Sequence, residues 1–163
     1  MKKLFLLSIL TVLSFTAVNA QDALSKGSWV IEANTGSATT GSTAFSLTST
    51  DGDTSFNIGA EAGYFVKENL AIKVGLGYAD ASESFAYKVG AKYYINGQFP
   101  VGADFTGVSG DGSDDSFIGL QGGYAWFVAP NVSIEPTVRY NFTLNEDDAE
   151  SGFQALIGFA FHF

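Results

Sequence analysis

Eight charged residues stand singly within segments that are otherwise apolar or rich in glycine. Four are acids and four are bases, so their formal charges cancel. If the fold encloses them in a narrow space, leaving any of them unpaired is costly, and the set predicts a network of hydrogen-bonded ion pairs. Its members are Glu32, Glu61, Lys73, Lys88, Lys92, Asp104, Glu135 and Arg139.

A second set of charges is wholly acidic and lies in four polar segments. Clustered carboxylates attract hard cations, and Asp51-Gly52-Asp53 has this character without the full spacing of a calcium loop. We expect a solvated, repulsive surface, with weak binding of divalent cations as the alternative. The acidic balance excludes nucleic acid as a partner. The eleven acids are Asp51, Asp53, Asp80, Glu83, Asp111, Asp114, Asp115, Glu146, Asp147, Asp148 and Glu150.

The residue types that most enzymes need are scarce. His162 is the only histidine, and the chain contains no cysteine. Disulfides and thiolate metal sites are therefore ruled out. No nucleophile motif, phosphate-binding loop or spacing of metal ligands occurs either. The sequence predicts neither catalysis nor a cofactor or metal site.

The first 20 residues have the pattern of a secretory signal peptide. Lys2 and Lys3 supply a positive start, residues 4–18 form an apolar run, and Val18-Asn19-Ala20 offers a small-residue cleavage site. The alternative, an N-terminal membrane anchor, is disfavoured because the apolar run is too short to span. We expect export, cleavage after Ala20 and one mature domain over 21–163.

The elements that must position the eight charges are strands. Apolar residues alternate with small or polar ones along most of the mature chain, which is the period of a half-buried strand. Each run is close to the length that crosses a bilayer when tilted. The predicted strands cover 28–35, 55–65, 70–78, 85–95, 99–107, 117–127, 132–144 and 152–163.

The connections between these strands alternate in length. Asn96-Gly97, in one of the short ones, is a typical hairpin dipeptide. Short turns at one end and long loops at the other are typical of a transmembrane barrel, with the short turns periplasmic. The short connections are 66–69, 96–98 and 128–131, and the mostly longer, polar ones are 36–54, 79–84, 108–116 and 145–151.

Each predicted strand has an apolar face and a face of glycines and single charges. Along 70–78, for example, Ile72 and Val74 flank Lys73, and Gly75 follows. An eight-stranded barrel is only just wide enough to be filled by side chains, so the many aromatic residues would not fit inside. Turning the glycine face inward leaves room for long charged side chains and directs the aromatic residues to lipid.

Two further positions bear on this arrangement. Trp29 opens the first predicted strand and Trp126 falls at the end of the sixth, so both lie at the short-turn end, as in an interfacial aromatic girdle. Pro136 falls inside the strand 132–144. A closed barrel pairs every strand on both sides, so the missing N–H of Pro136 requires a bulge or a local break.

Several stretches resemble the small bacterial outer-membrane β-barrel family, the OmpA/OmpX-type eight-stranded barrels. The resemblance implies no catalytic residues, and it implies that the barrel-assembly machinery reads the aromatic C-terminal strand, with Phe159, Phe161 and Phe163 as the assembly signal. The residues that carry it are Gly63-Tyr64-Phe65-Val66-Lys67-Glu68-Asn69-Leu70 running into Val74-Gly75-Leu76-Gly77-Tyr78, Pro130-Asn131-Val132 with Pro136-Thr137-Val138-Arg139-Tyr140, and the terminal Phe159-Ala160-Phe161-His162-Phe163.

The sequence thus predicts an all-β fold, an eight-stranded antiparallel up-and-down transmembrane β-barrel in the outer membrane of a Gram-negative bacterium. Its expected partners are outer-membrane lipid and the barrel-assembly machinery. The leading hypothesis for its function is a structural or surface-interaction role, with a lumen plugged by charges. Two alternatives stay open: a narrow porin-like diffusion channel for small solutes, and a soluble secreted ligand-binding barrel.

Overall fold

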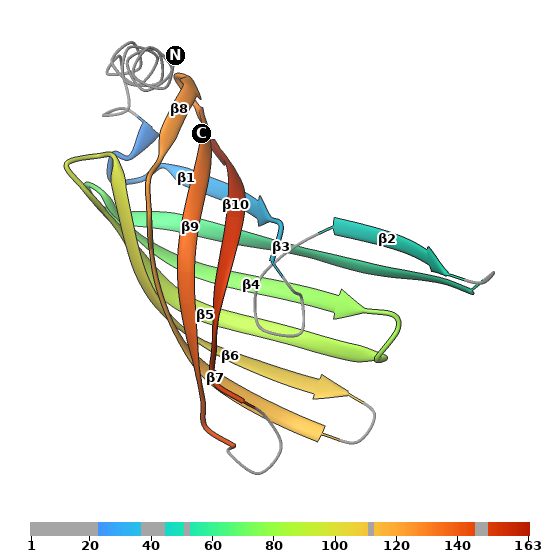
Figure 1. Cartoon of the computed structure of the whole chain (residues 1–163). Helices are drawn as coiled ribbons and strands as arrows, with labels where there is room; N and C mark the ends of the chain where they lie inside the picture. Colours follow the sequence, from blue (N-terminus) through green and yellow to red (C-terminus); the bar gives the residue numbers. More distant parts are fainter. Residues whose placement is uncertain (1–22, 37–44, 51–52, 111–112, 146–149) are drawn as a thin grey trace, which may run out of the picture.

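The computed structural model describes residues 23–36, 45–50, 53–110, 113–145 and 150–163. The predicted signal peptide and its cleavage site lie outside this part of the chain. Among the described residues, no helix is long and apolar enough to cross a membrane. The strands are β1 (Trp29–Asn34), β2 (Phe45–Thr50), β3 (Asp53–Lys67), β4 (Leu70–Ala79), β5 (Ser84–Ile95), β6 (Phe99–Gly110), β7 (Ser113–Gly123), β8 (Trp126–Ala129), β9 (Val132–Thr143) and β10 (Gly152–His162) (Figure 1).

These strands form an antiparallel barrel with eight strand positions (Figure 1). Around the barrel the order is β1, β10, β9, β7, β6, β5, β4 and β3, and β1 closes the ring because it pairs with both β10 and β3. The two remaining strands extend existing positions: β8 pairs with β9 after β7 ends, and β2 pairs with β3 beyond β1. The predicted fold class, an eight-stranded antiparallel up-and-down barrel, is confirmed.

The barrel is inverted relative to a soluble one, with its apolar side chains outside. Along β4, Val74 and Leu76 are 57% and 59% exposed. Lys73, which directly precedes Val74, is only 5% exposed. The same alternation of exposed and buried positions runs along β5 and β9. A soluble protein does not bury its lysines and expose its branched residues in this way, so the outer surface is one suited to lipid.

The short turns at one end follow the turn chemistry predicted from the sequence. Asn96 and Gly97 both have positive φ, 52° and 71°, as the two central residues of a type I′ hairpin require. The Gln98 N–H donates to the Ile95 carbonyl at 3.1 Å and closes the turn. Asn69, in the turn between β3 and β4, also has a positive φ of 63°. Asparagine tolerates this conformation better than most residues.

Two predicted elements need correction. The sequence predicts a loop over 36–54, but Phe45–Thr50 forms β2 against residues 53–58 of β3. Its Ser- and Thr-rich alternation is short and carries too few apolar residues to stand out as a strand. The predicted strand 117–127 is two strands, because Tyr124 and Ala125 interrupt it between β7 and β8.

The interruption accounts for Pro136 inside β9. The Tyr124 N–H donates to the Pro136 carbonyl at 3.1 Å. In an antiparallel ladder the nitrogen and carbonyl of one residue point to the same neighbouring strand. The Pro136 nitrogen therefore faces the break between β7 and β8. At this break the strand ladder requires no hydrogen bond from the residue at position 136, so the missing N–H is tolerated. On its other side Pro136 lies opposite Ile157 of β10.

Candidate functional site

The inward face of the barrel holds all eight single charges predicted for the lumen. They come from six of the eight strand positions. Each lies on the inward face of its strand, which it shares with the residues two positions away. All eight side chains form ion pairs, and each side chain is at most 10% exposed to solvent. The middle of the inward face therefore carries paired charges at positions where a soluble barrel would carry apolar side chains.

Six of these charges form one unbranched chain of ion pairs. Lys88 Nζ lies 2.7 Å from Glu61 Oε1, and Lys73 Nζ lies 2.5 Å from Glu61 Oε2. Lys73 also pairs with Glu32. Lys92 then links Glu32, at 2.6 Å from its Oε1, to Glu135. Acids and bases alternate along the whole chain, so each member faces opposite charge, as burial requires.

Neutral side chains complete the coordination of Glu135 at one end of this chain. The Tyr94 hydroxyl donates to Glu135 Oε1 at 3.0 Å, and the Ser133 hydroxyl donates to the same oxygen at 2.8 Å. Lys92 Nζ also lies 5.1 Å from the centre of the Tyr94 ring, a cation–π distance. Hydrogen bonds of this kind satisfy the lone pairs that the lysine leaves free.

Arg139 of β9 and Asp104 of β6 form a separate pair. Arg139 Nη1 and Nη2 donate to the two carboxylate oxygens of Asp104 at 2.5 and 2.6 Å, and Nε donates to Asn141 Oδ1 at 2.6 Å. Two parallel bonds of this type are stronger and more directional than one. A Cβ atom on Gly119 would collide with the guanidinium, so a larger residue there would require Arg139 to move. Among the ion pairs of the described residues, none joins this pair to the six-charge chain.

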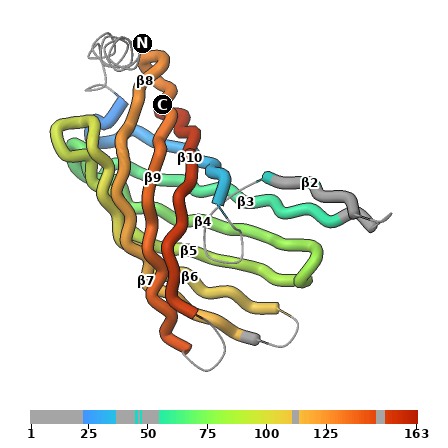
Figure 2. The backbone as a smooth tube through the Cα atoms, viewed as in Figure 1, coloured from blue at the N-terminus to red at the C-terminus, as the bar shows by residue number. Residues whose placement is uncertain are grey.

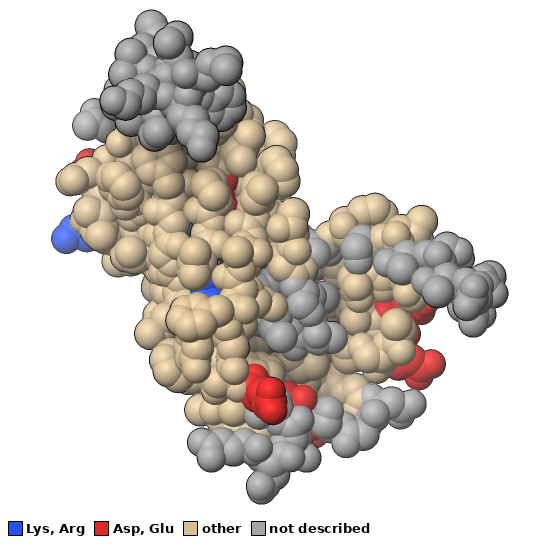
Figure 3. Space-filling model, viewed as in Figure 1, with Lys and Arg blue, Asp and Glu red and all other residues tan. Residues whose placement is uncertain are grey.

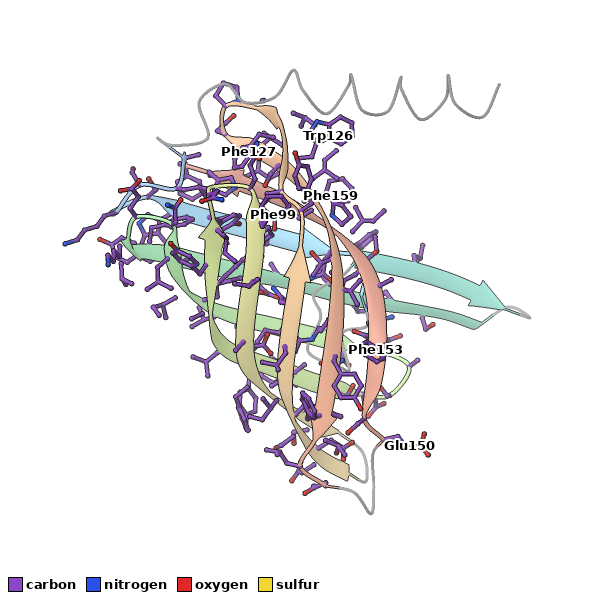
Figure 4. All side chains as sticks on the ribbon, turned by 60° about the vertical axis from the view of Figure 1, so that its left-hand side comes forward. Phe99, Trp126, Phe127, Glu150, Phe153 and Phe159 are labelled. Carbon is purple, nitrogen blue, oxygen red and sulfur yellow. The ribbon has the colours of Figure 1, made fainter. Side chains whose placement is uncertain are left out.

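An aromatic cluster lies on the inward face at the short-turn end. Phe65, Tyr94 and Phe127 are buried there with Leu24, which precedes β1. The His162 ring packs against them, with ring centres 5.3 Å from Phe127 and 6.2 Å from Phe65. Figure 4 places Phe127 at this end, close to Trp126, with Phe153 and Glu150 toward the other. We call Leu24, Phe65, Tyr94, Phe127 and His162 the aromatic layer.

The sequence pattern predicts only part of this layer, because it directs most aromatic residues to lipid. Phe65 and Phe127 instead point inward and are 0% and 5% exposed. For Phe65 a signal was present, because it stands four residues from Glu61 and so shares its face. For Phe127 no such signal exists, because the interruption at Tyr124 and Ala125 breaks the alternation of inward and outward side chains before this residue. A side chain judged by its type alone was assigned to the wrong face.

A smaller apolar cluster lies at the opposite end of the lumen. It consists of Ala86, Val108 and Phe117, which are buried together and face inward from β5, β6 and β7. The paired charges therefore lie between two apolar layers. A cavity of about 20 Å³ remains beside Glu32, Lys73, Lys92 and Glu135. A cavity of this size holds roughly one water molecule.

The site offers little for catalysis. Ser133 Oγ lies 3.2 Å from His162 Nε2, but the carboxylate of Glu135 contacts the serine rather than the histidine. A relay for a serine nucleophile needs the acid on the far side of the histidine. Ser133 is also fully buried. Among the described residues, no group of three or more His, Cys, Asp or Glu side chains is placed to hold a metal ion.

Acidic side chains gather at the long-loop end of the barrel (Figure 3). Asp114 accepts a hydrogen bond from the Ser109 hydroxyl at 2.7 Å, and its backbone carbonyl accepts one from the Asn145 side chain at 2.8 Å. Asp80, Glu83 and Glu150 are also described. Asp51, Asp111, Glu146, Asp147 and Asp148 lie outside the described residues.

The proposed assembly signal lies on the outward face of β10. Phe159, Phe161 and Phe163 are 46%, 55% and 67% exposed. The end of this strand is held by two backbone hydrogen bonds between Trp29 and Phe163, at 2.7 and 2.9 Å. The last aromatic residue is thus part of the barrel wall, and its ring points away from the lumen.

Solved structures are similar to this chain at low sequence identity. The N-terminal β-barrel domain of Pseudomonas aeruginosa OprF matches with a TM-score of 0.60 and 14% identity, over 85% of this chain and 98% of that one. The outer membrane protein Ail of Yersinia pestis gives a TM-score of 0.46 and 13% identity, over 85% and 100%. No protein-family model and no curated protein matches the sequence. The predicted resemblance to small outer-membrane barrels is confirmed at the level of the fold, by the OprF domain.

Proposed function

We propose that the chain is an outer-membrane β-barrel of a Gram-negative bacterium, exported with cleavage after Ala20, and that its lumen is closed. Its role is then structural or one of surface interaction, carried by the acidic loops. The outward belt of branched and aromatic side chains supports the membrane location, since such a surface on a soluble protein is an aggregation hazard. The same belt counts against the soluble ligand-binding alternative.

The proposal of a closed lumen is supported by the side chains that occupy the lumen. Six charges are joined in one chain, two more form a bidentate pair, and an apolar layer lies beyond each end of the set. The cavity of about 20 Å³ beside the six-charge chain is too small for a solute larger than water. Passage of a sugar or amino acid would require several buried ion pairs to separate at once, which leaves charges uncompensated.

The test of closure is solute entry into vesicles. Protein refolded into lipid vesicles is diluted into solutions of small sugars, and swelling is followed by light scattering. We expect rates equal to those of protein-free vesicles. Swelling that depends on the amount of protein and falls with sugar size would support the alternative of a narrow porin-like diffusion channel instead.

The acidic end supplies the surface at which an interaction would take place. The mature chain keeps six bases against 17 acids, so its exposed loops repel other acidic surfaces. Partners that fit are cationic groups or divalent cations bound weakly by the loop carboxylates. Calorimetric titration of refolded protein with Ca²⁺ tests the second of these, and we expect weak binding that disappears in high salt.

We further propose that Phe159, Phe161 and Phe163 are read during assembly by the barrel-assembly machinery. Their outward rings remain accessible along the last strand, which supports this role. Deletion of Phe163 should lower the amount of protein in the outer-membrane fraction, whereas Phe163→Tyr, which keeps an aromatic ring, should not. Normal levels of the deleted form would contradict the proposal.

A further inference from the structure

The charges outside the lumen are distributed unequally between the two ends of the barrel. After residue 20 the chain has six bases, and four of them are paired in the lumen. The other two, Lys26 and Lys67, are exposed at the short-turn end, where Lys26 precedes β1 and Lys67 ends β3. Acidic side chains gather at the opposite end (Figure 3). The short-turn end is therefore where an anion would meet free positive charge.

The segment before β1 is attached to the end of β3 by a β-bulge. The Phe65 N–H donates to the Ser28 carbonyl, and the Gly27 N–H donates to the Phe65 carbonyl, both at 2.9 Å. Residues 27 and 28 thus share one partner. Gly27 has a φ of 98°, as the first residue of this kind of bulge requires. Figure 2 shows the start of β1 running beside the turn that joins β3 to β4.

A second attachment follows on the other side of Lys26. The Asn69 N–H donates to the Leu24 carbonyl at 2.9 Å. Lys26 lies midway between this attachment and the bulge on its own segment, and Lys67 lies midway between them on the facing segment. The backbone therefore holds the two lysines as neighbours. Like charges at facing positions of paired strands are destabilising, so this arrangement favours the binding of an anion.

The described part of the chain supplies no paired carboxylate to these lysines. Glu68, which adjoins Lys67, is exposed, and none of the ion pairs of the described residues includes Glu68, Lys67 or Lys26. Asp22 lies outside the described residues. An anion from outside the chain would relieve the repulsion between the two ammonium groups.

An aromatic pair places these lysines at the level of lipid headgroups. Trp29 and Tyr64 lie opposite each other with ring centres 5.0 Å apart, and both are exposed. Exposed rings of these types mark the boundary between hydrocarbon and headgroups. Lys67 follows Tyr64 by three residues, which is about 10 Å along a strand and about 7 Å along the membrane normal at a tilt of about 45°. The headgroup layer extends about 5–7 Å beyond the hydrocarbon on each side.

We propose that Lys26 and Lys67 bind the phosphate of an anionic phospholipid in the leaflet at the short-turn end, with the lipid chains against Trp29 and Tyr64. A phosphodiester has acceptor oxygens for both lysines, and an ammonium group binds phosphate as a point charge without a fixed geometry. A zwitterionic headgroup carries a cation of its own, which the lysines repel. The inference rests on the proposed membrane location, and it does not depend on whether the lumen conducts.

Quenching of tryptophan fluorescence by brominated lipids tests this preference. Trp29 and Trp126 are the two tryptophans of the chain, so Trp126→Phe leaves Trp29 as the one reporter, beside the site. This variant is refolded into vesicles of phosphatidylglycerol and phosphatidylcholine in equal amounts, with bromine on the chains of one lipid or the other. The two degrees of quenching give the relative affinity of the anionic and the zwitterionic lipid for the surface beside Trp29.

We expect phosphatidylglycerol to be favoured at least about tenfold, because a lysine near the membrane surface contributes about fivefold. Lys26→Gln and Lys67→Gln should each lower the preference about fivefold, and the double variant should have none. Glu150→Gln, which changes a charge at the long-loop end, should leave the preference unchanged. Quenching by brominated phosphatidylcholine in each variant shows that the barrel is still inserted.

Two results would overturn the proposal while leaving the membrane location intact. One is equal quenching by the two brominated lipids in the protein that keeps both lysines. The other is a preference for phosphatidylglycerol that survives the double substitution of Lys26 and Lys67. If neither lipid quenched Trp29, the membrane location would be wrong, and this proposal would be overturned with it.

Discussion

The middle of the lumen and its short-turn end are equally buried, yet they are built from opposite residue types. The middle contains alternating acids and bases, each of which needs a specific partner at hydrogen-bonding distance. The aromatic layer contains rings that pack at centre distances of about 5–6 Å, and the rings of Phe65 and Phe127 need no hydrogen-bonding partner. Charges are directional and costly when left alone, whereas apolar packing is non-directional. Under the proposed closed lumen, the charges would specify the arrangement of the strands and the aromatic layer would seal one end.

The largest effect is expected where one charge of the middle region is removed. Arg139→Ala leaves Asp104 buried without its bidentate partner and should lower the free energy of unfolding by about 3–5 kcal/mol. Urea titration in vesicles, followed by tryptophan fluorescence, measures the loss. The control is Arg139→Ala combined with Asp104→Ala, which removes both charges and should recover part of the loss. A change within about 0.5 kcal/mol, as at an exposed site, would mean that Arg139 is hydrated.

Truncation in the aromatic layer should have a slightly smaller effect on stability. Phe127→Ala removes a buried ring and should cost about 3 kcal/mol, at the low end for such changes because the new space adjoins polar groups that admit water. Phe159→Ala, on the outward face, is the matched control and should cost less. Equal losses in the two variants would contradict the inward assignment of Phe127.

A charge introduced on the outward face of the barrel tests whether that face contacts lipid. Val74→Arg places a cation near the middle of β4 and should destabilise the folded state in a bilayer by about 2–3 kcal/mol. Ala81→Arg, in the exposed connection after β4, should be close to neutral. If Val74→Arg were also neutral, the outer face would not meet hydrocarbon, and the membrane location would be wrong.

The smallest effect is expected at the border between the two regions. Ser133 donates to Glu135 at 2.8 Å and lies 3.2 Å from His162. Ser133→Ala should cost about 1 kcal/mol, the usual net value of one hydrogen bond, since Tyr94 and Lys92 still contact Glu135. A loss as large as that of Arg139→Ala would place the critical link at this border instead of among the charges.

The sequence predicted the middle of the lumen better than its ends. A single charge such as Lys73 between Ile72 and Val74 stands out against an apolar strand, and strand parity then directs it inward. An inward Phe65 or Phe127 does not stand out, because aromatic residues also occupy the outer face. Pairing partners were not predictable either: Glu32 contacts Lys73, 41 positions away, and such contacts depend on register and on the shape of the barrel.

The first strand position and the interruption between β7 and β8 show a second limit of prediction from local sequence pattern. Phe45–Thr50 is rich in Ser and Thr, and only its level beside β3 identifies it as a strand. Pro136 signalled a break in a neighbouring strand, but it gave no position for that break. The break lies at Tyr124 and Ala125, where β7 gives way to β8 along β9. Local pattern thus predicted the need for an irregularity, and tertiary pairing decided its place.

The most direct test of the closed lumen is current across a planar lipid bilayer. Wild-type protein and the double variant Phe127→Ala with Arg139→Ala are inserted under the same salt and voltage. We predict no steady current for the wild type, and discrete openings for the double variant, in which both the aromatic layer and the charged middle are loosened. A wild-type protein with steady open conductance, unchanged in the double variant, would contradict it.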